Sequence, residues 1–229
     1  MTAAVNLLVV DDEPAIRRLL QTGLSAQGYH VTGAASAEEA IDQAAADPPD
    51  LVILDLGLPG LSGRDLLARW RGEGFTAPVV ILSSRTDEPG IVAALDAGAD
   101  DYVTKPFGMN ELIARLRVAL RHRLQQQGEK PLFQAGDLSV DLVRRIVRLK
   151  GAELRLSPKE YEILRLLVQH AGRVLTHHQI LSTVWGSAHD PQYLRVYIRQ
   201  LRQKLEDNPE QPRYIRTETG VGYRMREPD

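Results

Sequence analysis

The sequence predicts an α/β fold: a doubly wound, five-stranded parallel sheet, followed by a smaller domain with a helix-turn-helix and a β-hairpin. Three observations indicate this division. Short apolar runs alternate with amphipathic stretches over the first half, which is typical of strands buried under helices on both faces. A polar segment with Gly and Pro then interrupts the pattern. The net charge also changes, from −6 in residues 1–124 to +4 in residues 125–229.

The elements of the first half follow in chain order. A helix is expected from Pro14, because Ile16, Leu19, Leu20 and Leu24 recur at helical spacing. Apolar runs predict strands at residues 5–10, 51–54, 78–82 and 102–104. Amphipathic stretches predict helices near residues 37–46, 63–71, 90–97 and 109–124.

Polar side chains stand at the ends of these strands: Asp11, Asp12, Asp55, Ser83 and Lys105. Because sites in parallel sheets form outside the carboxyl ends of the strands, the five should converge on one cleft. Gathered carboxylates repel one another, and Mg²⁺ relieves that repulsion. A carboxylate can also attack phosphorus to give an aspartyl phosphate. Taken alone, each residue could instead cap a helix, begin a turn or carry a solvated charge.

The second half begins after a linker predicted at residues 124–131, which separates a first domain, 1–123, from a second, 132–229. Short β-segments are expected within residues 138–149, followed by a turn at 150–153. Helices are expected at 158–170, 177–185 and 191–206, the second capped by Thr176. Residues 213–225 predict two strands joined by a Gly-rich turn.

The helix expected at 191–206 has two different faces. Its apolar stripe consists of Leu194, Ile198, Leu201 and Leu205. Off the stripe lie Tyr193, Arg195, Tyr197, Arg199, Gln200, Arg202 and Gln203. Arg and Gln can bond to base edges and phosphates, so we expect this half to bind double-stranded DNA through a major groove. A solvated basic face on a helix bundle is the alternative.

Composition and short motifs exclude several classes of protein. The chain has no cysteine, hence no disulfide and no thiolate metal site. It has no signal-peptide pattern and no apolar run near the roughly 20 residues of a membrane helix, so we expect a cytoplasmic protein without a membrane partner. P-loop, Ser-His and H-x-x-x-H patterns of enzymes are missing.

Four motifs, "VVDDE", "LVILDLGLPG", "VVILSS" and "DDYVTKPF", resemble the flavodoxin-like receiver domain of two-component response regulators over residues 5–124. The resemblance implies that Asp55 accepts phosphate from the phosphohistidine of a sensor histidine kinase. It implies Mg²⁺ ligands at Asp11, Asp12, Asp55 and the backbone carbonyl of Gly57. Ser83 and Tyr102 match the family's switch pair, and the Lys105-Pro106 bond matches one that is cis in the family.

The second half resembles the winged-helix effector domain of the OmpR/PhoB class over residues 132–226, through "LSPKEYEILRLL", "GRVLTHHQILSTVWG", "YLRVYIRQLRQKLE" and "RYIRTETGVGYR". This implies phosphate contacts from Tyr197, Arg199 and Arg202, base contacts from Arg195 and Gln200, and Tyr223 and Arg224 in the wing. Thr219 stands where many relatives carry Arg. The motifs "DLGLP", "KPFG" and "YLRVYIRQLRQKLE" most resemble regulators of the Kdp potassium-uptake operon, which implies control of a potassium-transport operon.

The resemblance also implies a homodimer when the protein is phosphorylated, formed by the fourth helix, fifth strand and fifth helix. A two-fold interface lets each acid meet an arginine of the partner. The residues expected there are Asp96, Asp100, Asp101, Glu111, Arg115, Arg117 and Arg121. RNA polymerase is a further candidate partner.

We therefore expect a phosphorylation-activated transcription factor that binds a direct-repeat-like promoter site. Its only chemistry would be Mg²⁺-dependent self-phosphorylation and self-dephosphorylation at Asp55. One alternative is a phosphate-independent DNA-binding repressor with a vestigial receiver. Another is a phosphohydrolase with Asp55 as nucleophile, which would need a general acid such as an Asp where Gly57 stands.

Overall fold

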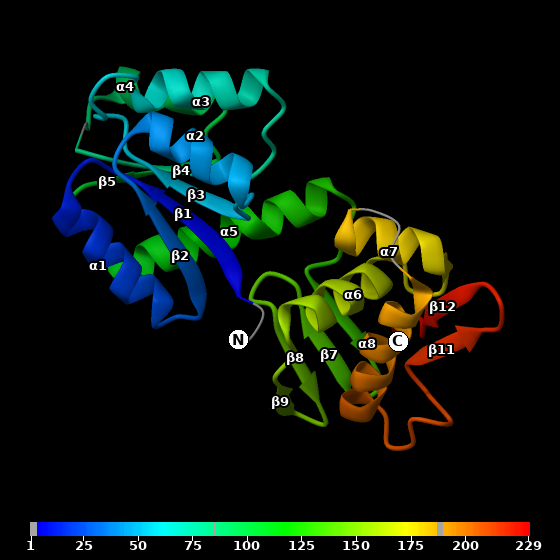
Figure 1. Ribbon diagram of the computed structural model, residues 1–229. Coiled ribbons are helices and arrows are strands. Elements are labelled where there is room, and N and C mark those ends of the chain that lie inside the picture. Colours follow the sequence, from blue (N-terminus) through cyan, green and yellow to red (C-terminus); the bar gives the residue numbers. More distant parts are fainter. Residues whose placement is uncertain (1–3, 85, 187–189) are drawn as a thin grey trace. The chain divides into compact units, whose positions relative to one another are not determined.

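The computed structural model describes residues 4–84, 86–186 and 190–229. They form two compact units, residues 4–127 and residues 128–229, each with its own core (Figure 1). No helix in the described ranges combines the length and apolar character needed to cross a bilayer.

The first unit contains a parallel sheet in the order β2-β1-β3-β4-β5. Its strands are β1 (Val5–Val10), β2 (Tyr29–Ala34), β3 (Leu51–Leu54), β4 (Val79–Ser83) and β5 (Asp101–Thr104). β1, β3 and β4 are almost wholly buried, as their apolar runs predict. The five-stranded parallel sheet is therefore confirmed.

Five helices cover this sheet on both faces: α1 (Pro14–Ser25), α2 (Ala37–Ala46), α3 (Gly63–Gly72), α4 (Glu88–Asp96) and α5 (Met109–Gln126). Figure 1 shows α1 and α5 on one face and α2, α3 and α4 on the other. Local chemistry sets where several of them begin. Pro14 occupies the first turn of α1, and the side chains of Ser36, Ser62 and Asp87 accept backbone N–H bonds at the starts of α2, α3 and α4.

Two features of the first unit differ from the sequence prediction. β2 contains no continuous apolar run, because it is an edge strand whose residues are partly exposed. α5 also continues to Gln126, beyond the expected end at residue 124. Leu124 is buried, and the Arg123 guanidinium donates to the carbonyl oxygen of Asp50 at 2.9 Å, so these packed residues extend the helix into the predicted linker.

The second unit begins with an antiparallel sheet in the order β6-β7-β8-β9. Its strands are β6 (Leu132–Ala135), β7 (Leu138–Asp141), β8 (Ile146–Leu149) and β9 (Ala152–Leu154). Three helices follow: α6 (Pro158–Gln169), α7 (His177–Trp185) and α8 (Pro191–Leu205). Thr176 caps α7 in a capping box, as predicted. β6 and β9 were not predicted as separate strands, and β9 includes the second half of the expected turn.

A three-stranded sheet, in the order β10-β12-β11, completes the second unit. Its strands are β10 (Val174–Thr176), β11 (Ile215–Glu218) and β12 (Gly222–Met225). The hairpin β11–β12 was predicted, but β10 is too short to give a sequence pattern. Gly222 allows β10 to approach, because a Cβ there would overlap the carbonyl oxygen of Leu175. We call the hairpin β11–β12 with its turn the wing.

Candidate functional site

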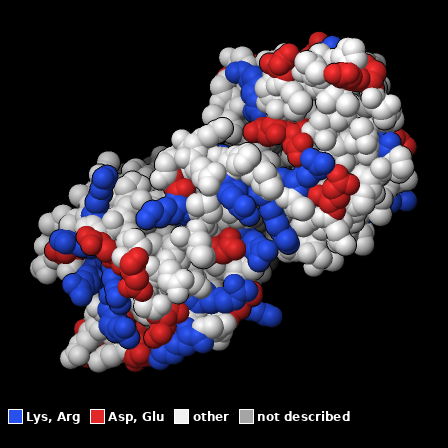
Figure 2. Space-filling view, turned by 180° about the vertical axis from the view of Figure 1, so that it is seen from behind, with Lys and Arg blue, Asp and Glu red and all other residues white. Residues whose placement is uncertain are grey.

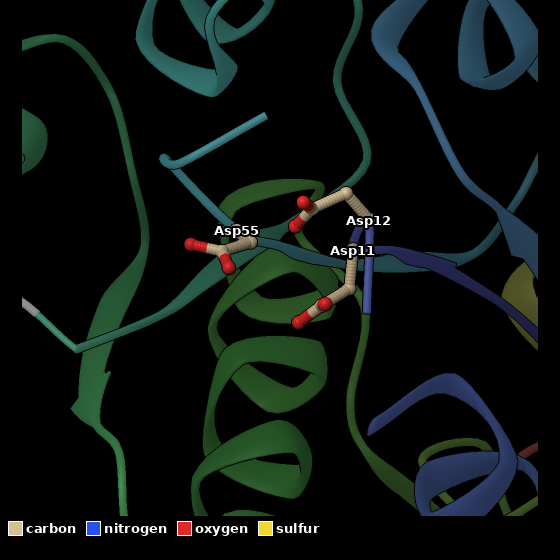
Figure 3. A group of neighbouring side chains, drawn as sticks. All are labelled: Asp11, Asp12 and Asp55. Carbon is tan, nitrogen blue, oxygen red and sulfur yellow. The ribbon is translucent and has the colours of Figure 1, made fainter. Parts of the chain in front are cut away.

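Two neighbouring strands bring the predicted acidic residues together. Val10, at the end of β1, lies opposite Leu54, at the end of β3, so the residues that follow each strand are neighbours. The N–H of Asp55 donates to the carbonyl oxygen of Val10 at 2.8 Å and fixes this register. Figure 3 shows the side chains of Asp11, Asp12 and Asp55 gathered at this edge of the sheet.

The three carboxylates form a group suited to a hard cation. One oxygen from each lies within 4.8 Å of the other two. Asp11 and Asp55 are buried at 1% and 7% exposure, whereas Asp12 is exposed and opens the group to solvent. Mg²⁺ prefers oxygen ligands and keeps several waters, which fits two buried acids beside one exposed acid.

Lys105, which follows β5, holds the two buried acids together. Its Nζ lies 2.8 Å from Oδ2 of Asp11 and 2.8 Å from Oδ2 of Asp55. Glu13 is a weaker third partner at 3.4 Å. Burial lowers the pKa of Lys105, but its hydrogen bonds to both acids and their charges outweigh burial and raise it above the ordinary value. Burial raises the pKa of Asp11, against the opposing effect of Lys105.

Two further residues lie against the backbone of Asp11 and Asp55, and the sequence analysis assigned neither contact. The Arg17 Nη1 donates to the carbonyl oxygen of Asp11 at 2.5 Å, which ties α1 to the loop after β1. Gly63 opens α3 so close to the end of β3 that a Cβ there would overlap the carbonyl oxygen of Asp55. Both contacts use a backbone carbonyl, which no residue pattern reveals. The N–H of Gly57 donates to Oδ1 of Asp55 at 3.0 Å.

The predicted switch pair lies beside this group. Ser83 ends β4 at 2% exposure, and its carbonyl oxygen accepts the N–H of Lys105 at 2.8 Å. Tyr102, in β5, is 9% exposed and belongs to the core cluster that includes Ala94 and is covered by Ile91 of α4. The ring is therefore directed inward. The Lys105-Pro106 peptide bond is cis, as the resemblance implies.

Four of the charged residues expected at a dimer interface have partners within their own chain. Arg115 on α5 bonds to Asp101 at 3.1 Å and to Glu111 at 3.0 Å. Asp100 accepts from Arg71 of α3 at 2.9 Å and from the N–H of Val79 at 2.8 Å. Asp100 thus ties the start of β5 to α3 and β4 of its own unit, and its role in an interface stays a prediction. The exposed members of the set are Asp96, Asp100, Glu111 and Arg121, and Arg117 is partly buried.

α8 separates into the two faces that the sequence predicts. Leu194, Ile198, Leu201 and Leu205 are all buried. On the opposite side Tyr193, Arg195, Arg199, Gln200 and Gln203 are exposed, while Tyr197 is partly buried against Trp185 at 5.6 Å between ring centroids. Figure 2 shows many Lys and Arg side chains on the visible face of the second unit.

Three further residues expected at a DNA surface make contacts within the second unit. Tyr223, in β12 of the wing, is only 5% exposed, and its ring makes an edge contact with that of His177. Arg202 bonds to β11 through Nε and Nη2. Arg224 pairs with Glu218 across the wing at 2.8 Å, although its side chain remains 43% exposed. The sequence alone could not show these contacts, because they join residues far apart in the chain.

Comparisons with known proteins agree with both units. Residues 7–117 match the family described as response regulator receiver domain, and residues 151–225 match transcriptional regulatory protein, C terminal. The transcriptional regulatory protein KdpE of Mycobacterium tuberculosis is 48% identical over 96% of this chain and 98% of its own length. The KDP operon transcriptional regulatory protein KdpE of Escherichia coli is 46% identical with the same coverage.

A solved receiver domain, that of the Francisella response regulator 1452, superposes with a TM-score of 0.50 and is 31% identical; it covers 52% of this chain and 98% of its own. The acidic group with its lysine, the order of the two units and these relatives lead to one assignment. The chain belongs to the two-component response regulators of the OmpR/PhoB type, and it is a KdpE-like, phosphorylation-activated transcriptional regulator.

Proposed function

We propose that Asp55 accepts a phosphoryl group from the phosphohistidine of a sensor histidine kinase. The observation that supports this most is the position of Lys105, whose Nζ bonds to Asp55 and Asp11 at 2.8 Å each. A carboxylate oxygen of Asp55 attacks phosphorus, the bond from phosphorus to the histidine nitrogen breaks, and the electron pair stays on the histidine. The Lys105 ammonium then balances charge on the phosphoryl oxygens.

Mg²⁺ is the proposed cofactor, held by Asp11, Asp12, Asp55 and the backbone carbonyl of Gly57. When bound, the ion would neutralise the acids and the incoming phosphoryl oxygens. Asp12 is the exposed member and gives the ion its entry path. Self-phosphorylation from a small phosphodonor and self-dephosphorylation at Asp55 follow from the same arrangement.

The proposed response to phosphate passes from Ser83 to Tyr102. The Ser83 hydroxyl donates to a phosphoryl oxygen, and the inward ring of Tyr102 fills the space behind it. A two-fold homodimer then forms through α4, β5 and α5. Its charged residues would be Asp96, Asp100, Asp101, Glu111, Arg115, Arg117 and Arg121. Of these, Asp101, Glu111 and Arg115 would exchange partners within the chain for partners across the interface.

The dimer is proposed to bind a direct-repeat-like site in double-stranded DNA. α8 would enter the major groove, with Arg195 and Gln200 toward bases and Tyr197 and Arg199 toward phosphates. Tyr193 and Gln203 lie on the same helix, and Arg224 lies in the wing. Two relatives are KdpE regulators, so we propose a potassium-transport operon as the target, with RNA polymerase as a further partner.

Labelling by acetyl phosphate tests the phosphoacceptor. In the presence of Mg²⁺ the wild type should gain one phosphoryl group, measured by intact mass, and chelation should prevent it. Asp55→Asn should gain none. Asp42→Asn, which changes an exposed acid on α2, is the control and should label normally.

Two outcomes would contradict the proposal. Full labelling of Asp55→Asn would place the phosphoryl group elsewhere. Labelling of the wild type that leaves its affinity for the promoter DNA of a potassium-transport operon unchanged would indicate a DNA-binding protein that ignores phosphate.

A further inference from the structure

A hydrogen-bonded brace joins α8 to the wing. Nε and Nη2 of Arg202 both donate to the carbonyl oxygen of Ile215, at 3.0 and 2.7 Å. Nη2 also donates to Oγ1 of Thr217 at 2.7 Å. Three bonds from one planar group fix both the distance and the orientation of β11 relative to the helix.

The guanidinium also lies over an aromatic ring. Its Cζ lies 5.8 Å from the centroid of the Tyr223 ring, which is 5% exposed in β12. Tyr223 pairs with Thr217 of β11 and Leu175 of β10, so this residue lies where the three strands of this sheet meet. Burial lowers the pKa of Arg202, but the guanidinium stays charged at neutral pH. The aromatic face, the carbonyl oxygen of Ile215 and the hydroxyl of Thr217 compensate for lost water.

Arg202 therefore differs from the other arginines of α8. Arg195 and Arg199 are exposed on the face turned away from the apolar stripe, whereas Arg202 lies next to Leu201 of that stripe and is partly buried. An arginine that contacts a DNA phosphate needs its donors free toward solvent. Arg202 has already directed three donor contacts to β11.

We infer that Arg202 is a positioning residue that sets the angle between α8 and the wing, rather than a phosphate contact. This rests on the proposed DNA-binding function. With the brace in place, the wing turn at residues 219–221 is held in one orientation relative to the groove-facing side of α8. Without it, the wing must be ordered when DNA binds, and that ordering weakens the affinity.

The test uses the full-length protein and two readouts. Hydrogen exchange of the β11 and β12 amides, measured without DNA, reports on the brace itself. Affinity for a mixed-sequence DNA duplex at low salt, measured by fluorescence anisotropy, reports on its consequence. Arg202→Lys keeps the charge but loses the planar fork, Thr217→Val removes one acceptor, and Arg199→Ala is the matched change on the exposed face of the same helix.

We expect Arg202→Lys and Arg202→Ala to accelerate exchange in the wing by about tenfold or more, since charged hydrogen bonds are lost. Arg202→Lys and Arg202→Ala should also raise the dissociation constant for DNA, each by a similar factor. Thr217→Val should weaken it less and add little to Arg202→Ala, because the two residues act as a unit. Arg199→Ala should weaken DNA binding without changing exchange in the wing.

The inference is overturned if Arg202→Ala leaves exchange in the wing unchanged, or if Arg202→Lys binds DNA within about twofold of the wild type, as a phosphate contact by charge alone would allow. If the proposed DNA-binding function is wrong, the outcome is different. In that case the wild type and Arg199→Ala bind DNA equally poorly, while the exchange data still decide whether the brace exists.

Discussion

Replacing Lys105 by Met should destabilise the first unit in the absence of Mg²⁺. The change leaves the carboxylates of Asp11 and Asp55, with side chains 2% and 10% exposed, without their shared cation. Removing one partner of a buried ion pair costs about 3–5 kcal/mol, and we expect about 3 kcal/mol because the exposed Asp12 opens the group to water. For a unit of this size that corresponds to a loss of roughly 10 °C in Tm.

The two tryptophans provide a separate signal from each unit. Trp70 of α3 is 3% exposed and stacks on Phe75, while Trp185 lies in the second unit. In a Trp185→Phe background, Trp70 fluorescence during urea unfolding follows the first unit alone. Lys150→Met, which removes a largely exposed ion pair in the second unit, should leave this transition unchanged.

The loss of stability caused by Lys105→Met should depend on pH and on Mg²⁺. Burial already raises the folded-state pKa of Asp11, and removing Lys105 raises it further. A carboxyl whose pKa is higher folded than unfolded disfavours folding at neutral pH, and that penalty falls as pH drops through the raised value. The difference in the free energy of unfolding between Lys105→Met and the wild type should therefore become smaller toward pH 5, and also at saturating Mg²⁺. A variant as stable as the wild type in chelator at pH 7 would refute this reasoning.

Three other changes have definite expected outcomes. Gly63→Ala should destabilise the first unit by about 2 kcal/mol or more, because the new Cβ forces the backbone near Asp55 to move. Gly72→Ala, where a Cβ meets nothing within 4 Å, should not destabilise it, and urea unfolding followed by Trp70 fluorescence compares the two variants. Arg17→Ala should raise the Mg²⁺ dissociation constant about tenfold, because it frees the loop after β1. Mg²⁺ titrations of this variant and of the control Arg18→Ala, which changes an exposed arginine, measure this effect, and equal dissociation constants for the two variants would contradict it. Glu206→Gln should destabilise the second unit by about 2 kcal/mol, because three backbone N–H groups before and within β11 lose a charged acceptor. An unchanged urea-unfolding transition, followed by Trp185 fluorescence, would exclude this.

The sequence predicted those parts that depend on local patterns. Apolar runs located β1, β3, β4 and β5, and the residues after them located the acidic group and Lys105. β2 and β10 were missed because an edge strand and a three-residue strand carry no periodic signal.

The contacts that were missed act through the backbone or across long stretches of chain. Arg17 and Gly63 contact carbonyl oxygens, whose position depends on the fold and not on a side-chain type. Arg202 looks like its neighbours on α8, and only its distance from β11 distinguishes it. Sequence patterns place such residues on an element but do not show which partner they meet.

A crystal structure of the full chain with Mg²⁺ and beryllofluoride, which mimics a phosphoryl group, tests the central claim most directly. The account predicts beryllofluoride on the Asp55 carboxylate, the metal ion between Asp12 and Asp55, and the Lys105 ammonium in contact with a fluorine atom. Beryllofluoride on another residue, or Lys105 directed away from Asp55 beside a metal-free acidic group, would contradict it.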